Sequence, residues 1–169
     1  MKIECFINKS VKYENSNDNE FFYYFKLYSA TWIDESVSKI TSYEKITMPD
    51  GSVYSISKGT GGGKDNTGKY TATECIGHRL EKNNKLIELK FFCNSELSNG
   101  DKYYFMQYRT ASDTDVGVGK GVILGGTNIF SELKGTKCLY GIKHLKKNIY
   151  TTTKCEIPDN IFNYLKNQN

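Results

Sequence analysis

Two histidines, a glutamate and several tyrosines are the side chains that could carry acid–base chemistry in this chain. His78 and His144 are the only histidines, and histidine is the natural general acid or base near neutral pH. Glu74, Tyr108 and Tyr140 are further candidates for proton transfer or for stabilising a developing charge. No spacing indicates a Ser/His/Asp triad, so a purely structural role for each histidine stays open.

The five cysteines do not have the spacing of a metal site. No C-x-x-C pair occurs, and the intervals fit no zinc pattern. We therefore expect no metal site in this chain.

Two glycine-rich runs approach phosphate-binding motifs without matching them. In the run Lys58–Lys64, Lys58 stands where a P-loop has its first glycine, and Asp65 replaces the magnesium-binding hydroxyl. The run Gly117–Gly121 misses the dinucleotide spacing and is more typical of a bulge or a sharp coil in a strand. We expect no cofactor.

The elements that position these residues are strands. Aromatic and alternating runs recur about every ten residues and are separated by turn residues, whereas helical periodicity is absent before the last dozen residues. The runs predict ten strands: Phe22–Tyr28, Thr31–Ile40, Tyr43–Met48, Ser52–Lys58, Lys69–Arg79, Leu86–Asn94, Lys102–Ala111, Gly117–Leu124, Gly135–His144 and Ile149–Ile157. Residues 8–20 and 58–68 are polar or glycine-rich and read as loops at the rims.

A meander of this kind hides its edges by closing. The sequence therefore predicts an all-β fold, a single antiparallel β-barrel of about eight to ten strands over residues 1–157. Residues 158–169 form a short helical tail, in which Ile161, Phe162 and Leu165 could plug one end.

The expected hairpin turns predict which side chains face inward. With Asn99-Gly100 as a two-residue turn, Phe91 lies opposite Tyr108, and Cys93 lies opposite Met106. Lys90 and Arg109 then face outward. One apolar face results, with Ile87, Leu89, Phe91, Cys93, Tyr104, Met106 and Tyr108.

With Lys146-Lys147 as the next turn, Tyr140, Ile142 and His144 face inward, with His144 near the barrel mouth. The same register places Cys138 opposite Cys155, close enough for a disulfide.

A second cysteine pair depends on the length of another turn. Cys75 lies opposite Cys93 if the Asn83-Asn84 turn takes three residues, whereas Glu74 takes that place and His78 faces inward if it takes two. Disulfides and buried thiols both stay open, and the absence of a signal peptide favours thiols. Cys5 is left over in either case.

Composition limits the classes of partner. The net charge of +4 comes almost wholly from lysine, with Arg79 and Arg109 the only arginines, which argues against nucleic acid because its readers use arginine for bidentate contacts. No run approaches the ~18 apolar residues of a membrane helix. The first residues, Met1–Phe6, lack the apolar segment of a signal peptide and predict a cytoplasmic protein. A periplasmic or secreted protein is the alternative if further residues precede Met1.

The segment Gly121–Gly135 resembles a strand–turn–strand segment of the allene oxide cyclase and dirigent β-barrels and their small bacterial relatives. Those barrels have Gly-Gly-Thr-Gly, an aromatic residue shortly after it, and a glycine that opens the next strand. The matching residues are Gly125, Gly126, Thr127, Phe130 and Gly135, with Asn128 in place of the last glycine of the first group. The resemblance implies a barrel of about eight strands around an apolar cavity, often in a homo-oligomer, and it assigns no catalytic residue.

Three functions stay open. The first is a barrel that binds a small apolar or aromatic molecule among its inward side chains, namely Phe91, Met106, Tyr108, Tyr140 and Ile142. A cavity above ~300 Å³ would favour this reading over a barrel filled by its own side chains. The second is a cyclase or isomerase that uses Glu74, His144, Tyr108 or Tyr140. The third is a protein-interaction module with an exposed aromatic patch around Phe21–Phe25.

Overall fold

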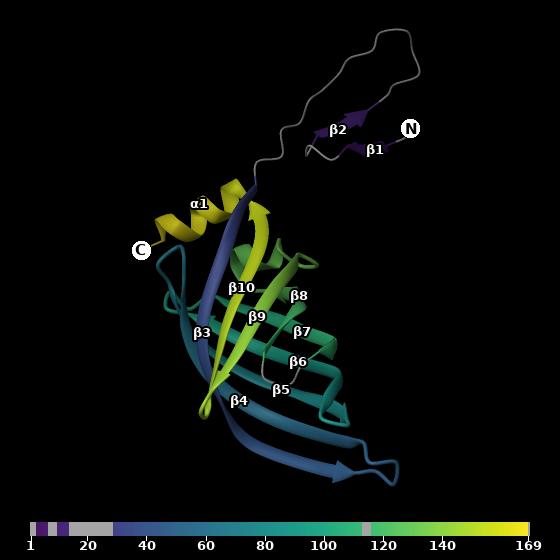
Figure 1. Cartoon of the computed structure of the whole chain (residues 1–169). Coiled ribbons are helices and arrows are strands. Elements are labelled where there is room, and N and C mark those ends of the chain that lie inside the picture. Colours follow the sequence, from purple (N-terminus) through teal and green to yellow (C-terminus); the bar gives the residue numbers. More distant parts are fainter. Residues whose placement is uncertain (1–2, 7–9, 14–28, 113–115, 169) are drawn as a thin grey trace.

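The chain folds into a closed barrel of eight antiparallel strands, as the sequence predicts (Figure 1). The computed structural model describes residues 3–6, 10–13, 29–112 and 116–168. Helix accounts for 10% of the described structure, which confirms the expectation of an all-β fold.

Each barrel strand pairs with its neighbour in sequence, and β10 closes the barrel by pairing with β3. The barrel strands are β3 (Ser29–Thr47), β4 (Val53–Asp65), β5 (Tyr70–Lys82), β6 (Lys85–Leu97), β7 (Lys102–Ser112), β8 (Val116–Gly126), β9 (Lys137–Leu145) and β10 (Asn148–Pro158). A separate two-stranded antiparallel sheet contains β1 (Ile3–Phe6) and β2 (Ser10–Tyr13).

Four of the predicted elements differ from those observed. The two strands expected within residues 31–48 are a single strand, β3, which bends at a register shift between Ile40 and Ser42. The glycine-rich run expected to be a rim loop is strand β4 as far as Asp65, and residues 10–13 form β2 where a loop was expected. The strand expected at Phe22–Tyr28 and the aromatic patch at Phe21–Phe25 lie outside the described residues.

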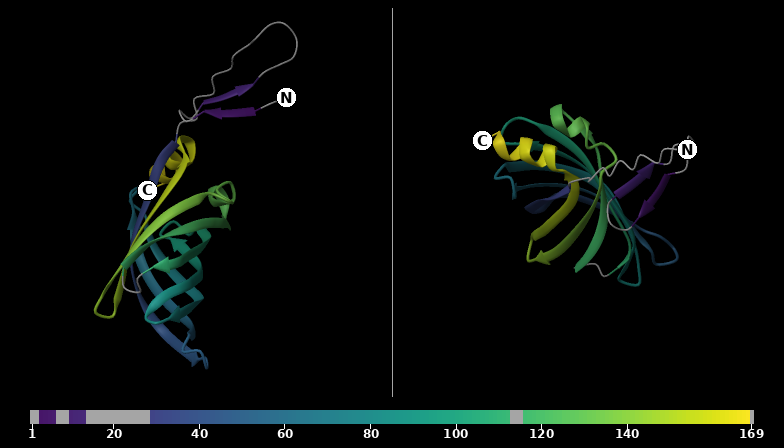
Figure 2. Two further views of the ribbon diagram at one scale, coloured as in Figure 1. Left: turned by 45° about the vertical axis from the view of Figure 1, so that its right-hand side comes forward. Right: turned by 90° about the horizontal axis from the view of Figure 1, so that it is seen from above.

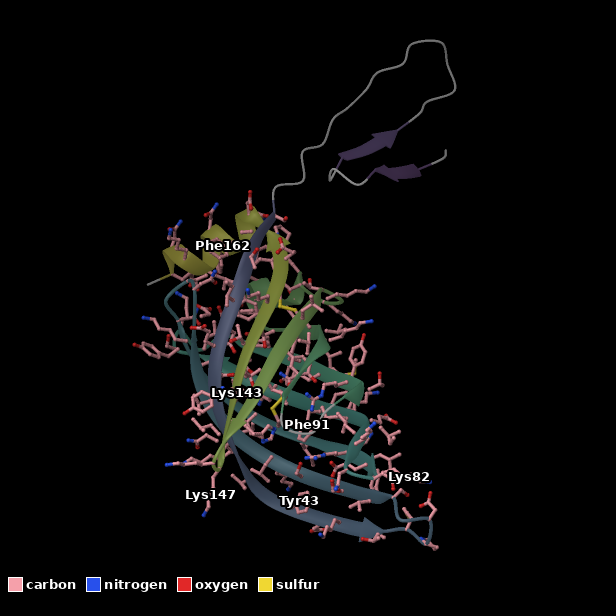
Figure 3. The ribbon with its side chains drawn as sticks, in the orientation of Figure 1. Tyr43, Lys82, Phe91, Lys143, Lys147 and Phe162 are labelled. Carbon is pink, nitrogen blue, oxygen red and sulfur yellow. A yellow bond between two sulfur atoms is a disulfide. The ribbon has the colours of Figure 1, made fainter. Side chains whose placement is uncertain are left out.

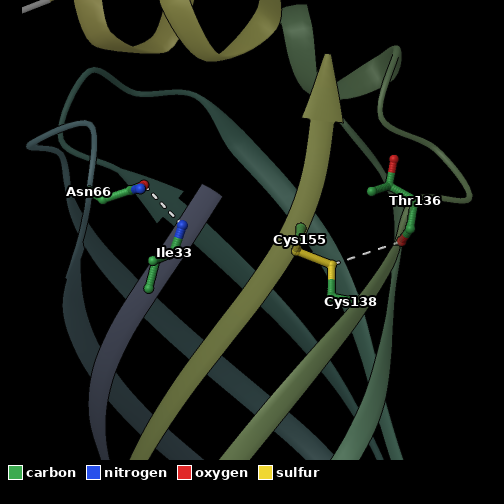
Figure 4. The surroundings of a disulfide bond; sticks show 5 residues. All are labelled: Ile33, Asn66, Thr136, Cys138 and Cys155. Atoms are coloured by element: carbon green, nitrogen blue, oxygen red, sulfur yellow. Dashed lines mark hydrogen bonds between the residues drawn. A yellow bond between two sulfur atoms is a disulfide. The ribbon is translucent and has the colours of Figure 1, made fainter. Parts of the chain in front are cut away.

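The β9–β10 hairpin has the predicted register. Lys146 adopts a positive φ of 57°, as a tight two-residue turn requires, and Leu145 pairs with Asn148. Cys138 consequently lies opposite Cys155, and the two form a disulfide with a Cα–Cα distance of 4.3 Å (Figure 4). The prediction that these cysteines are cross-strand neighbours is confirmed.

The β5–β6 hairpin combines the two alternatives that the sequence left open. Asn83 and Asn84 form a two-residue turn with φ values of 52° and 59°. A register shift after Leu80 then leaves Ile87 without a partner on β5, and it turns Ile87 outward, 45% exposed. Beyond this bulge Cys75 lies opposite Cys93, and the two form the second disulfide.

The predicted register of the β6–β7 hairpin is wrong by one residue. The Leu97 N–H donates to the Asp101 carbonyl, the Gly100 N–H donates to the Leu97 carbonyl, and Gly100 adopts a φ of 87°. The loop therefore contains Ser98 as well as Asn99 and Gly100. Phe91 therefore lies opposite Gln107 and not Tyr108. Because side chains alternate along a strand, this slip reverses the faces of β7. Tyr103, Phe105, Gln107 and Arg109 face inward, and Tyr104, Met106 and Tyr108 face outward.

One end of the barrel is closed by a packed aromatic core. Trp32, Tyr103 and Phe130 are at most 5% exposed, and Phe130 belongs to the short 3-10 helix η1 (Asn128–Ser131). Helix α1 (Asp159–Asn167) lies at this end (Figure 2) and buries Ile161 and Leu165. The predicted helical plug is thus confirmed. No helix among the described residues is long and apolar enough to cross a membrane.

Candidate functional site

Small side chains on the inner face leave the barrel partly hollow. Strand β4 turns Ser55, Ser57 and Gly59 inward, and all three are buried. On β8 the inward positions are Gly117, Gly119 and Gly121. An added Cβ at these glycines would overlap the side chains of Arg109, Tyr140 and Phe105, respectively. The run Gly117–Gly121 pairs with β9 in unbroken register, so the bulge expected there is not observed. The glycines instead make room for three large side chains that lie over them.

The wider of two internal cavities occupies the half of the barrel away from α1 and has a volume of about 150 Å³. Phe91 lines it and lies inside the barrel between α1 and the β9–β10 turn at Lys147 (Figure 3). The apolar lining residues are Ile40, Tyr43, Leu89, Phe91, Ile142 and Ile149. Ile40 and Tyr43 are 44% and 51% exposed, so this cavity reaches solvent at the rim.

The second cavity lies nearer the closed end and has a volume of about 70 Å³. Its lining is more polar, because Asp34 and a ring of hydroxyl side chains face it below Trp32 and Tyr103. Ser38, Gly61 and Thr151 line both cavities. Neither cavity reaches the ~300 Å³ that would by itself indicate a drug-sized ligand. A cavity near 150 Å³ does admit one benzene-sized ring.

Two aspartates meet on the inner face at the closed end. Asp34 and Asp65 are direct cross-strand partners, and both are buried. Asp65 accepts hydrogen bonds from the Trp32 indole at 2.9 Å and from the backbone N–H groups of Thr67 and Lys69. Its carboxylate therefore holds the loop that leads into β5.

Asp34 has fewer compensating partners. The Thr71 hydroxyl donates a long hydrogen bond to it, at 3.4 Å. Burial, together with the nearby Asp65 carboxylate, raises the pKa of Asp34 to about 6. An acid with this pKa can exchange a proton near neutral pH, which makes Asp34 an acid–base candidate in the narrow cavity.

The raised pKa of Asp34 makes stability depend on pH. Its folded-state pKa lies above the unfolded value of about 3.9, so its favourable contribution is complete below pH 4 and is lost as pH rises through 6. We expect Asp34→Asn to raise the free energy of unfolding by on the order of 2 kcal/mol at pH 7.5 and to change it little at pH 4. Urea denaturation at both pH values measures this, with the exposed neighbour Glu35→Gln as control. An equal effect of Asp34→Asn at the two pH values would contradict the prediction.

Two arginines, Arg79 and Arg109, line the wider cavity, and none of its described lining residues is acidic. Arg79 forms an ion pair with Glu81. Arg109 is 4% exposed, and its Nε and Nη1 atoms have no hydrogen-bond partner among the described residues.

The Tyr140 hydroxyl is the second unsatisfied group beside Arg109. Tyr140 is 2% exposed, and its hydroxyl oxygen is buried without a hydrogen-bond partner among the described residues. Burial raises the pKa of Tyr140 to about 12, against the opposing effect of the nearby Arg109 charge. Burial also lowers the pKa of Arg109, but a guanidinium stays charged in proteins.

The structure brings together part of the predicted site. Phe91, Ile142 and His144 line the wider cavity, with His144 near the end of β9. Tyr140 is buried on the inner face over Gly119 and does not itself line either cavity. Tyr108 and Met106 lie on the outer face because of the register slip in the β6–β7 hairpin.

The remaining acid–base candidates are also outside the barrel. Glu74 is exposed on the outer face, since its neighbour Cys75 points inward into the disulfide. His78 stacks on Tyr54 and contacts Glu88 at 3.3 Å.

Sequence reasoning missed Asp34, Arg79 and Arg109 as inner residues. A usable signal existed for Arg109, because Ser98-Asn99-Gly100 can form a three-residue loop with glycine at its left-handed position. That reading places Arg109 inside.

Comparison with known proteins does not identify a relative. No family model matches the chain, and neither a curated protein nor a solved structure does.

Proposed function

We propose that this protein binds a small apolar or aromatic molecule inside its barrel, with the wider cavity as the binding site. The main support for this proposal is the cavity of about 150 Å³, which is lined by Phe91, Leu89 and Ile142 and reaches solvent at the rim. Binding pockets are mostly apolar with a few polar groups. The cavity size supports a ligand with a single ring or a short branched chain.

Retention of a ligand tests this proposal. Native mass spectrometry of the protein purified from its own host should detect a bound small molecule that denaturation releases. Ser38→Phe should abolish retention, because Ser38 lines both cavities and a phenyl ring would fill the space. The matched control is Val37→Phe, since Val37 directly precedes Ser38 on β3 and is 40% exposed. Equal retention in the two variants would contradict an internal site.

We further propose an oxidising compartment, the periplasm or the cell exterior, in place of the cytoplasm expected from the first residues. The two disulfides support this location, because such bonds persist outside the reducing cytoplasm.

A cyclase or isomerase is the second candidate, and Asp34 supports it. A buried acid with a pKa of about 6 beside the ligand cavity suits proton transfer to or from a bound intermediate. Isomers share a mass, so the retained molecule should be extracted and compared by chromatography between the wild type and Asp34→Asn. A ligand with the same retention time in both supports binding alone, whereas a different isomer in the variant supports catalysis.

A further inference from the structure

Arg109 is a buried cation for which the described part of the chain supplies no anion. Arg109 is 4% exposed, and its Nε and Nη1 atoms lack hydrogen-bond partners among the residues that the structure describes. The residue opposite it on β6 is Leu89, and the nearest inward position on β8 is Gly117, over which the guanidinium lies. A buried charge without a partner is strongly unfavourable, so this arrangement indicates an anionic group that the described residues do not supply.

The neighbouring groups suit an incoming anion. The Tyr140 hydroxyl is a buried donor without a partner in the described part of the chain, and it lies near enough to Arg109 for the two to interact electrostatically. Gln107, two residues before Arg109 on β7, lines the same cavity. The carboxylate of Glu81 on β5 is already paired with Arg79.

The shape of the cavity limits the rest of the molecule. Phe91, Ile142 and Ile149 form apolar walls, and the volume of about 150 Å³ suits a single ring. A guanidinium offers parallel N–H groups that match the two oxygens of a planar carboxylate.

We propose that Arg109, assisted by Tyr140, is the carboxylate-binding group of the wider cavity, and that the ligand is a small aromatic or branched aliphatic monocarboxylate. This inference rests on the proposed ligand-binding function and specifies the chemical class of the ligand.

Benzoate and benzamide test the proposal, because they have nearly the same shape and differ in charge. Isothermal titration calorimetry of the full chain should show that wild type binds benzoate at least about tenfold more tightly than benzamide. Arg109→Gln should remove that difference and leave benzamide binding unchanged. Lys120→Gln is the matched control, since it also removes one positive charge but lies exposed on the outer face of β8, and both affinities should stay as in wild type.

Three further measurements separate carboxylate recognition by Arg109 from a general effect of charge or of folding. Arg109→Lys should give an intermediate benzoate affinity, because it keeps the charge and loses the planar fork. Inorganic phosphate at the same concentration should not displace benzoate. The thermal midpoint of Arg109→Gln should not fall below that of wild type, since the substitution removes an unpaired buried charge.

Each contrary outcome has a distinct meaning. Equal binding of benzoate and benzamide by wild type, or unchanged benzoate binding by Arg109→Gln, overturns the carboxylate inference while the cavity still binds a ring. A lower thermal midpoint for Arg109→Gln would assign Arg109 to the fold and also overturns it. If wild type binds neither probe, the carboxylate inference fails for ring-sized ligands, and the retained-ligand measurement decides separately whether the cavity binds a molecule at all.

Discussion

Adding a single methyl group at Gly126 should lower the free energy of unfolding by about 2–4 kcal/mol. A Cβ there would overlap the backbone carbonyl oxygen of Lys102 and would lie 2.6 Å from the Cβ of Phe130. Neither group can move away easily. The Lys102 carbonyl accepts a hydrogen bond from the Thr127 N–H at 2.8 Å, and Phe130 is fully buried in the closed end.

Gly141→Ala is the matched control for this measurement. Gly141 has no atom within 4 Å of an added Cβ, so alanine there should be neutral or stabilising by up to about 1 kcal/mol. Urea denaturation of the two variants gives both values. Similar stabilities for Gly126→Ala and Gly141→Ala would show that the barrel end is not packed as described.

The same contacts explain the segment in which the sequence resembles the allene oxide cyclase and dirigent barrels. Gly125 and Gly135 adopt φ values of 131° and 87°, and the Thr127 hydroxyl accepts a hydrogen bond from the Lys102 N–H at 2.8 Å. Asn128 also has a positive φ, 46°, in the place where those barrels have glycine. The segment therefore has a structural role in packing the closed end of the barrel. Membership in those families stays a prediction.

The strands could be predicted because their signals are local. Alternating side chains and turn residues such as Asn83-Asn84 and Lys146-Lys147 act over a few positions, and the cysteine pair at the β9–β10 hairpin followed from one turn alone. The glycine-rich part of β4 could not be recognised in this way. Its strand conformation depends on pairing with β3 and β5 on both sides, and glycine has little preference for a strand by itself.

The site was harder to predict than the fold because it depends on register. Because the loop before Asp101 is one residue longer than predicted, Arg109 and not Tyr108 lies on the inner face. Likewise, the bulge at Ile87 places Cys75 opposite Cys93. Such shifts leave strand assignments unchanged and reverse which side chains face inward. Asp34 gave no signal of its own, because its raised pKa arises from burial and from Asp65, 31 positions away in sequence and adjacent in the barrel.

Trp32 is the side chain on which the closed end depends most. It is 1% exposed, and its ring lies edge-on to Tyr103 with centroids 5.4 Å apart and at 5.8 Å from Phe130. Its indole N–H donates to Asp65 at 2.9 Å. Removing the side chain would leave a cavity among aromatic rings and would also deprive a buried carboxylate of a donor.

We therefore expect Trp32→Ala to lower the free energy of unfolding by about 5 kcal/mol, from the cavity and the lost hydrogen bond together. Trp32→Phe keeps most of the volume and should cost about 2 kcal/mol, mainly from the hydrogen bond to Asp65. Leu139→Ala, at a side chain that is 58% exposed, should change stability by less than about 0.5 kcal/mol. Urea denaturation followed by circular dichroism measures all three, since Trp32 is the only tryptophan and fluorescence would be lost with it. If Trp32→Phe were neutral while Trp32→Ala kept its full effect, Asp65 would not depend on the indole, and its other donors would suffice to hold the loop into β5.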